Sequence, residues 1–207
     1  MNNTEKNNFI TSILIFSKKN TKYIIILIII LMLIFSSFYL YNFFVEKKMY
    51  ETSIKYNKSK NLNSENDFLI AMSEISENKN FFGILASLEI INNNVKNKNY
   101  NEAYNNYLKI LESKNLDKNY RSLISIHASY NLIDKIEILK IYNILDHYDD
   151  SAESFLGFYN EILFLLSIIE KDKNKIDILY NKIISNNKIS ETIKQRVKNI
   201  NDFENNK

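Results

Sequence analysis

The stretch FFGILASLEIINNNVKNKNYNEAYNNYLKILES, from Phe81 to Ser113, has the pattern of two α-helices joined by a short polar turn. The polar break lies at Asn97 to Asn99. After it, Ala103, Tyr107 and Ile110 recur at spacings of four and three residues, which places them on one face of a helix. The stretch therefore predicts a helical hairpin with an apolar seam.

The same triplet recurs along the chain at an almost constant interval. Steps of 35, 35 and 38 residues connect four triplets, and every member is apolar or aromatic: Phe68, Met72 and Ile75; Ala103, Tyr107 and Ile110; Ile138, Tyr142 and Leu145; Ile176, Tyr180 and Ile183. An apolar or aromatic residue also stands twelve positions before each triplet, at Tyr56, Ile91, Ile126 and Phe164. This period predicts four helix pairs, and a non-repetitive helical bundle with a chance period is the alternative.

The segments between these helices are rich in Asn and Asp. Both side chains bond to nearby backbone groups, so they can form turns and helix caps in place of Gly and Pro. A last helix is predicted at Ser190 to Phe203, with Ile193, Val197 and Ile200 on one stripe. It is expected to cap the open end of the stack.

The composition supports an all-α fold. The chain has no cysteine and no proline, and its two glycines are Gly83 and Gly157. Strand-rich folds need frequent turn residues, which this chain does not supply. Disulfide frameworks, thiolate catalysis and Gly-rich phosphate loops are excluded on the same grounds.

A transmembrane helix is predicted at Tyr23–Val45, which is 23 residues long and carries no charge. About 20 apolar residues are enough to span the hydrocarbon of a bilayer. A cleaved signal peptide and a buried core helix are the alternatives, but the run is long for a signal peptide and lacks a small-residue cleavage site. The predicted organisation is a tail (1–22), a transmembrane helix (23–45) and a helical repeat domain (46–207). The apolar stretch Phe9–Phe16 is too short to span a bilayer as a helix. Its sequence fits either a segment that lies in the membrane interface or a poorly ordered tail.

The orientation of this helix is weakly indicated by its lysines. Three lysines flank the span closely on the N-terminal side, and two on the other. Over a wider window, four lysines precede the predicted transmembrane helix and five follow it. The positive-inside rule therefore favours a cytoplasmic N-terminus only weakly.

Charge argues against nucleic-acid binding. Residues 46–207 contain 23 basic and 23 acidic residues, because four of the 27 basic and one of the 24 acidic residues precede Glu46. Phosphate recognition needs a basic stripe, and the chain has only two arginines, Arg121 and Arg196.

No catalytic or metal site is predicted. The two histidines, His127 and His147, lack partners in a metal-binding pattern such as H-E-x-x-H. Asp146, Asp149 and Asp150 lack the glycine and terminal glutamate of a calcium loop and are expected to lie in a solvated turn. We therefore expect a non-enzymatic protein without a cofactor.

A period near 34 in helix pairs is typical of tetratricopeptide repeats. The run YNEAYNNYLKILE matches that pattern well, whereas Ile138 and Ile176 replace the small residue in later units. The predicted fold class is an N-terminal transmembrane helix followed by an α-solenoid of about four degenerate tetratricopeptide-like pairs and a C-terminal capping helix.

This organisation resembles the YfgM-like family of bacterial ancillary Sec-translocon subunits. Phe81–Ser113 is similar to the central repeat of that family, and Ser151–Ser190 to its C-terminal repeat, over roughly residues 23–200. The apolar Phe9–Phe16 departs from the charged N-terminus of the family. The resemblance implies a single-pass inner-membrane protein with a periplasmic repeat domain, associated with translocon subunits and periplasmic chaperones.

The concave face of such a solenoid is lined by the first helices of the pairs. The predicted partner-binding groove is therefore Asn92, Val95, His127 and Tyr130, although such positions can also simply pack against the next helix. Without an Arg or Lys cluster there, capture of a peptide carboxylate is not expected. Unfolded secreted chains or partner helices are the expected ligands.

Two functions follow as hypotheses. The first is a translocon-associated component of a chaperone network. The second is a structural adaptor that tethers envelope assembly or cell-division proteins. A weaker third possibility reverses the topology and makes the repeats a cytosolic scaffold.

Overall fold

The computed structural model describes the backbone of residues 3–114 and 116–206, and the side chains of residues 19–114, 116–204 and 206. Within these residues it contains nine α-helices, one short 3₁₀ helix and no strand, so the predicted all-α class is confirmed. The helices are α1 (Asn3–Ser59), α2 (Glu65–Ser76), α3 (Phe81–Lys96), α4 (Tyr100–Leu111), α5 (Lys118–Leu132), α6 (Ile138–Leu145), η1 (Glu153–Phe155), α7 (Leu156–Ile169), α8 (Lys173–Ser185) and α9 (Glu191–Asn205).

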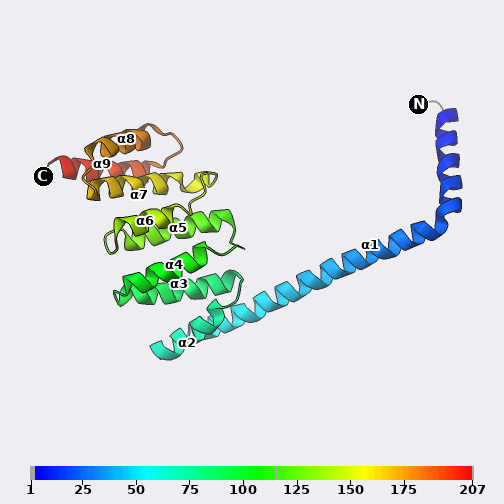
Figure 1. The fold of residues 1–207 in the computed structure, drawn as a ribbon, viewed down its shortest axis with the longest axis horizontal. Helices are drawn as coiled ribbons and strands as arrows, with labels where there is room; N and C mark the ends of the chain where they lie inside the picture. Colours follow the sequence, from blue (N-terminus) through cyan, green and yellow to red (C-terminus); the bar gives the residue numbers. More distant parts are fainter. Residues whose placement is uncertain (1–2, 115, 207) are drawn as a thin grey trace. The chain divides into compact units, whose positions relative to one another are not determined.

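The chain divides into two compact units, Met1–Ile54 and Lys55–Lys207. The first unit is the larger part of α1, and its helical geometry breaks at Asn20 (φ −114°, ψ 16°). Figure 1 shows this break as a bend near the dark blue end of the ribbon. The backbone of Phe9–Phe16 is helical, but the side chains of this segment lie outside the described ones.

The apolar part of α1 is the one helix of the described residues that is long and apolar enough to cross a membrane. Its apolar window has a mean hydropathy of 2.8, and its side chains are exposed from Ile25 to Phe35. A membrane span and a signal sequence both satisfy this description. None of the window is buried, whereas the core helix of a water-soluble fold is mostly covered.

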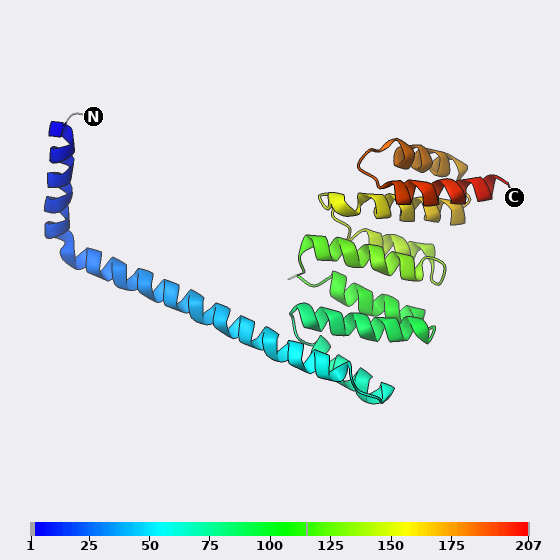
Figure 2. The ribbon, with the colours of Figure 1, turned by 180° about the vertical axis from the view of Figure 1, so that it is seen from behind.

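The second unit contains α2 to α9 (Figures 1 and 2); α2 to α7 follow one another along the stack in chain order, and α8 and α9 lie together at its far end, with α9 against both α7 and α8. Consecutive helices from α2 to α6 pack on one another, and α7 packs on α5, α8 and α9. The twelve repeat positions all lie on α2, α4, α6 and α8, the predicted second helices of the pairs. Seven of the twelve are buried and five are half-buried, so every triplet faces the interior. The last helix, predicted at Ser190–Phe203, is α9 at Glu191–Asn205.

The buried apolar residues form three clusters. The largest extends from α3 to α7 and includes Ile91, Tyr107 and Ile162. A second joins α7, α8 and α9 through Phe164, Ile183 and Val197, and a third lies between α2 and α3. Tyr107 is fully buried, whereas Tyr142, expected to be an equivalent core residue, is only half-buried.

The turns that join α3 to α4 and α7 to α8 have the same backbone geometry. Lys98 and Lys171 have positive φ angles of 62° and 57°, and each lies five residues before the first member of a repeat triplet. After α3, the N–H groups of Lys98 and Asn99 donate to the carbonyls of Val95 and Asn94. These are the two hydrogen bonds of a Schellman motif, in which glycine normally takes the left-handed position.

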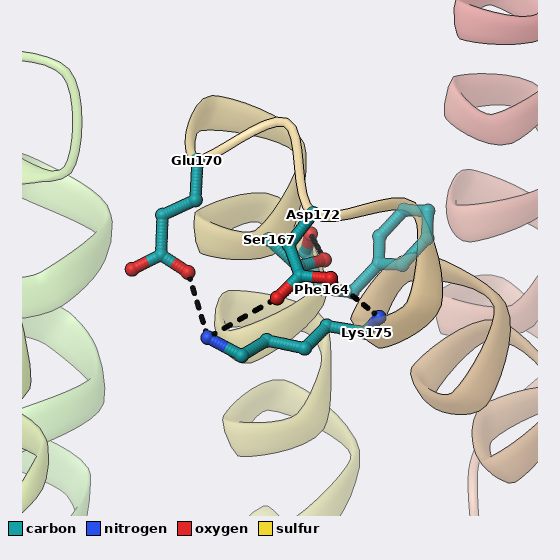
Figure 3. A network of polar contacts seen from close by, with 5 residues as sticks. All are labelled: Phe164, Ser167, Glu170, Asp172 and Lys175. Carbon is teal, nitrogen blue, oxygen red and sulfur yellow. Dashed lines mark hydrogen bonds and ion pairs between the residues drawn. The ribbon is translucent and has the colours of Figure 1, made fainter.

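In the turn after α7, the N–H groups of Lys171 and Asp172 donate to the carbonyls of Ile168 and Ser167 in the same way. This turn also has a helix cap and an ion pair, which Figure 3 shows. Asp172 accepts a hydrogen bond from the backbone N–H of Lys175 at 3.1 Å, which caps α8. The Lys175 Nζ lies 3.1 Å from Glu170 Oε2 and 3.5 Å from Asp172 Oδ2. This turn illustrates the predicted use of Asp in place of Gly and Pro.

Candidate protein-binding surface

The solvent-exposed face of α5 carries a stripe of large side chains. Tyr120, Leu123 and His127 are exposed and recur at spacings of three and four residues, so they share one face of the helix. Tyr130 continues the stripe and is half-buried. The opposite side of α5 is buried and carries three serines; Ser125 donates to the carbonyl of Ile144 on α6 at 2.8 Å.

Ring contacts extend this stripe to the neighbouring first helices. Phe81 on α3 lies against Tyr120, with ring centroids 6.2 Å apart. Phe158 on α7 meets Tyr130 edge-on at 6.5 Å. We call the four exposed apolar residues Phe81, Tyr120, Leu123 and Phe158 the apolar row; their exposed fractions are 46, 50, 44 and 36%.

Single exposed hydrophobic residues are ordinary on a protein surface, but connected ones on successive elements point to an interaction site. Leu139 on α6 and Ile178 on α8 are more exposed than the row, at 78 and 66%. Each stands on a predicted second helix of a pair, whereas the members of the row stand on first helices. They therefore serve as comparison positions for the row.

The four residues predicted to line the groove fall into two pairs. Asn92 and Val95 lie on α3, where Asn92 is exposed and Val95 packs against the largest core cluster. His127 and Tyr130 lie one turn apart on α5, and Tyr130 packs against the same cluster. The sequence analysis did not identify the apolar row. The spacing of Tyr120, Leu123 and His127 was a readable signal, whereas the contact with Phe81 depends on how α3 and α5 pack.

His127 belongs to a polar cluster at the middle of the stripe. The Tyr107 hydroxyl accepts a hydrogen bond from Asn131 Nδ2 at 2.9 Å and lies 2.9 Å from His127 Nδ1. Although one edge of the His127 side chain is exposed, partial desolvation of its ring lowers the pKa of His127 below its ordinary value, and burial raises the pKa of Tyr107 to about 12. Both groups are therefore uncharged at neutral pH. The polar groups of the cluster bond to one another, since Asn131 Nδ2 also lies 3.3 Å from His127 Nε2.

A charged network lies at the α7 end of the stripe. Arg196 on α9 binds the Glu161 carboxylate on α7 with two N–H groups, and its Nε is 2.8 Å from Oε1. The Tyr130 hydroxyl donates to Glu161 Oε2 at 2.7 Å. Glu161 is almost fully buried, whereas nearly half of the Arg196 side chain is exposed. Burial and the neighbouring carboxylate raise the pKa of Tyr130, so its hydroxyl stays protonated.

This network brings one arginine from α9 beside Tyr130, a neighbour that the sequence pattern did not indicate. Its charge is compensated by Glu161, so the guanidinium is not a free anion receptor. The pairing could not be read from the sequence, since 35 residues separate Glu161 from Arg196.

Other hollows of the second unit lie away from the row. A groove of about 980 Å³ is lined by residues of α2, α3 and α4 and of the loops beside them, and serines, lysines and glutamates are among its lining residues. Among the described residues there is no group of three or more His, Asp or Glu side chains that could hold a metal ion. The apolar row therefore remains the candidate site.

Comparison with family models, with curated proteins and with solved structures gives no match for this chain.

Proposed function

We propose that this protein is a membrane-anchored protein–protein interaction module. Tyr23–Val45 holds it in the bilayer, and the second unit presents the apolar row to a partner protein. The observation that carries the proposal is the row itself: four exposed apolar side chains on three successive first helices, of which Phe81 lies against Tyr120, and Phe158 lies against the neighbouring Tyr130. Aromatic residues of this kind are enriched at protein interfaces.

The proposal treats the second unit as a tetratricopeptide-like solenoid of four helix pairs closed by α9. Three features support this assignment. The repeat triplets fall in register on α2, α4, α6 and α8, none of their twelve members is exposed, and α3 and α7 end in the same Schellman turn. Solenoids of this type bind partners along the face of their first helices.

The finer proposal is an ancillary role at the Sec translocon, with the second unit in the periplasm and in contact with chaperones there. Its support is the resemblance of Phe81–Ser113 and Ser151–Ser190 to repeats of the YfgM-like family, together with the small excess of lysines before the span. No catalytic step is part of this proposal.

Lysine-reactive crosslinking of the full chain in intact membranes distinguishes the translocon role from the alternative, a structural adaptor for envelope-assembly or cell-division proteins. Adducts with subunits of the translocation channel are expected. Adducts only with division or envelope-assembly proteins would replace the translocon role by the adaptor role. Adducts only with cytosolic proteins would contradict both, because they require the opposite topology.

A further inference from the structure

The N-terminal part of α1 is a helix of its own, separated from the apolar span by a break. The backbone is helical from Asn3 onwards, and the helical geometry fails at Asn20, shortly before the span begins at Tyr23 (Figure 1). The apolar stretch in this first part, Phe9–Phe16, is too short to cross the hydrocarbon of a bilayer as a helix. It is therefore a short helix that leads into the span and does not form a second crossing.

Sequence spacing divides this short helix into an apolar and a polar face. Successive residues of an α-helix are turned by about 100°. Five apolar residues consequently fall within less than half of the helix circumference: Phe9, Ile10, Ile13, Leu14 and Phe16. The rest of the circumference carries Thr11, Ser12, Lys18 and Lys19, and Ile15 and Ser17 depart from the division. Helices with two such faces lie in the plane of a membrane interface.

The net charge of the chain is concentrated around the break. Residues 1–22 contain four lysines and one glutamate, a net charge of +3, which equals the net charge of the whole chain. Lys18, Lys19 and Lys22 flank the break, and no acidic residue follows Lys18 before the end of the span. The side chains of Lys19 and Lys22 are exposed. Basic residues next to a span are attracted to anionic lipid headgroups.

We propose that Phe9–Lys19 is an in-plane helix of the membrane interface, and that Lys18, Lys19 and Lys22 bind the headgroups of anionic phospholipids there. Chain continuity and charge identify this occupant. The span begins within one helical turn of the break, so the same bilayer is available to cover the apolar face, and an anionic surface complements the +3 charge. The inference uses the membrane span of the proposed function and is independent of its partner-binding surface.

The depth of the segment in the bilayer tests its in-plane position. Because the chain has no cysteine, a single introduced cysteine is a unique labelling site. Nitroxide labels are placed one at a time at residues 9 to 19 of the full chain in liposomes that contain anionic phospholipid. Collisions with oxygen and with a water-soluble nickel complex then report the depth of each label. We expect an oscillation with a period of about 3.6 residues, with Ile13 below the headgroups and Thr11 on the water side.

Equal lipid composition in both leaflets makes this result independent of the topology of the chain. A depth that changes steadily along residues 9 to 19 would overturn the in-plane helix, and so would uniform access of the nickel complex. A label at Ile34, in the middle of the span, is the reference. A deep Ile34 above a fully water-accessible segment would leave the proposed anchor standing without the in-plane helix, whereas a water-accessible Ile34 would contradict the anchor itself.

Lipid preference is measured with a fluorophore on a cysteine introduced at Ser17. The quencher is carried by brominated acyl chains, so the headgroups of the anionic and the zwitterionic lipid stay unmodified. At equal mole fraction and low salt, we expect the anionic lipid to be enriched roughly fivefold around the label, the factor that one lysine near an anionic surface supplies. Most of this enrichment should be lost at high salt, because salt screens exposed charges.

Substitution of the lysines tests whether they cause the preference. Lys18→Gln/Lys19→Gln/Lys22→Gln should bring the ratio of the two lipids close to one. Lys47→Gln/Lys48→Gln, beyond the other end of the span, is the matched control and should leave the ratio unchanged. Equal quenching by both lipids in the unaltered chain, or an enrichment that survives the triple substitution, would overturn the proposed headgroup binding.

Discussion

Lys98 and Lys171 hold a backbone conformation that favours glycine, at φ 62° and 57°. A side chain with a Cβ is strained in the left-handed region, and the surrounding Schellman bonds fix both lysines there. The chain uses its two glycines elsewhere, so these turns carry strain that the fold tolerates.

Replacing Lys98 by glycine should stabilise the protein. Lys98→Gly removes the Cβ strain and is expected to raise the free energy of unfolding by about 0.5–1 kcal/mol. Chemical denaturation of the full chain in mild detergent measures this change. The control is Lys96→Gly at the last residue of α3, where glycine relieves no strain and should cost up to about 1 kcal/mol. Equal effects of the two variants would contradict the strained turn.

His127 should make stability depend on pH. Its folded pKa is lowered from 6.5 by burial, so below pH 6.5 the unfolded chain takes up a proton that the folded chain resists. Stability is therefore lost as the pH falls from 6.5 towards the folded value. His127→Gln keeps a hydrogen-bonding partner for Tyr107 and removes this titration. The melting temperature of the variant should fall less than that of the parent chain between neutral and mildly acidic pH; parallel curves would show that His127 does not contribute.

At the scale of the elements, the helix pairs were predictable and the contacts between them were not. Spacing alone placed the triplets on α2, α4, α6 and α8, because one helical face must stay apolar to be buried. The unpredicted η1 lies in a loop, where periodicity gives no signal. The Glu161–Arg196 and Phe81–Tyr120 contacts join residues 35 and 39 positions apart, and they exist only after α9 packs on α7 and α5 lies beside α3.

Gly83 allows the start of α3 to approach the loop before it. A Cβ there would collide with the backbone carbonyl oxygen of Asn78. Gly83→Ala should therefore lower the free energy of unfolding by about 1–3 kcal/mol, despite the better helix propensity of alanine. At Gly157 the added Cβ would meet side chains alone, the end of Ile193 at 2.7 Å and Cγ2 of Ile189 at 3.3 Å. Gly157→Ala should be milder in the same denaturation experiment, and the reverse order would contradict this packing.

Tyr107 connects the largest core cluster to the polar cluster of the stripe. Its ring is fully buried and its hydroxyl is bonded, so Tyr107→Ala should cost about 3–5 kcal/mol. Tyr142→Ala should cost less, because Tyr142 is half-buried. Lys109→Ala, at an exposed position of α4, should cost under about 0.5 kcal/mol. Equal denaturation midpoints for Tyr107→Ala and Lys109→Ala would contradict the register of α4.

At the scale of the whole molecule, the proposed anchor Tyr23–Val45 would determine the compartment in which the second unit lies. If Tyr23–Val45 is a retained span, mass spectrometry of the membrane fraction should find it uncleaved, and alkaline washing should not release the chain. A reporter fused after Lys207 that is active only in the cytoplasm should stay silent. A released chain lacking the apolar segment would identify it as a signal sequence, and an active reporter would place the second unit in the cytoplasm.

The central claim is that the apolar row is the surface that meets a partner protein, and position-specific photocrosslinking tests it most directly. A photoreactive residue is placed in the full chain at Tyr120 or Phe158, or at the comparison positions Leu139 and Ile178, which are more exposed. After irradiation of intact membranes, the account predicts a discrete protein adduct from Tyr120 and Phe158, and little from Leu139 and Ile178. Equal adducts from all four positions, or adducts only from Leu139 and Ile178, would contradict it.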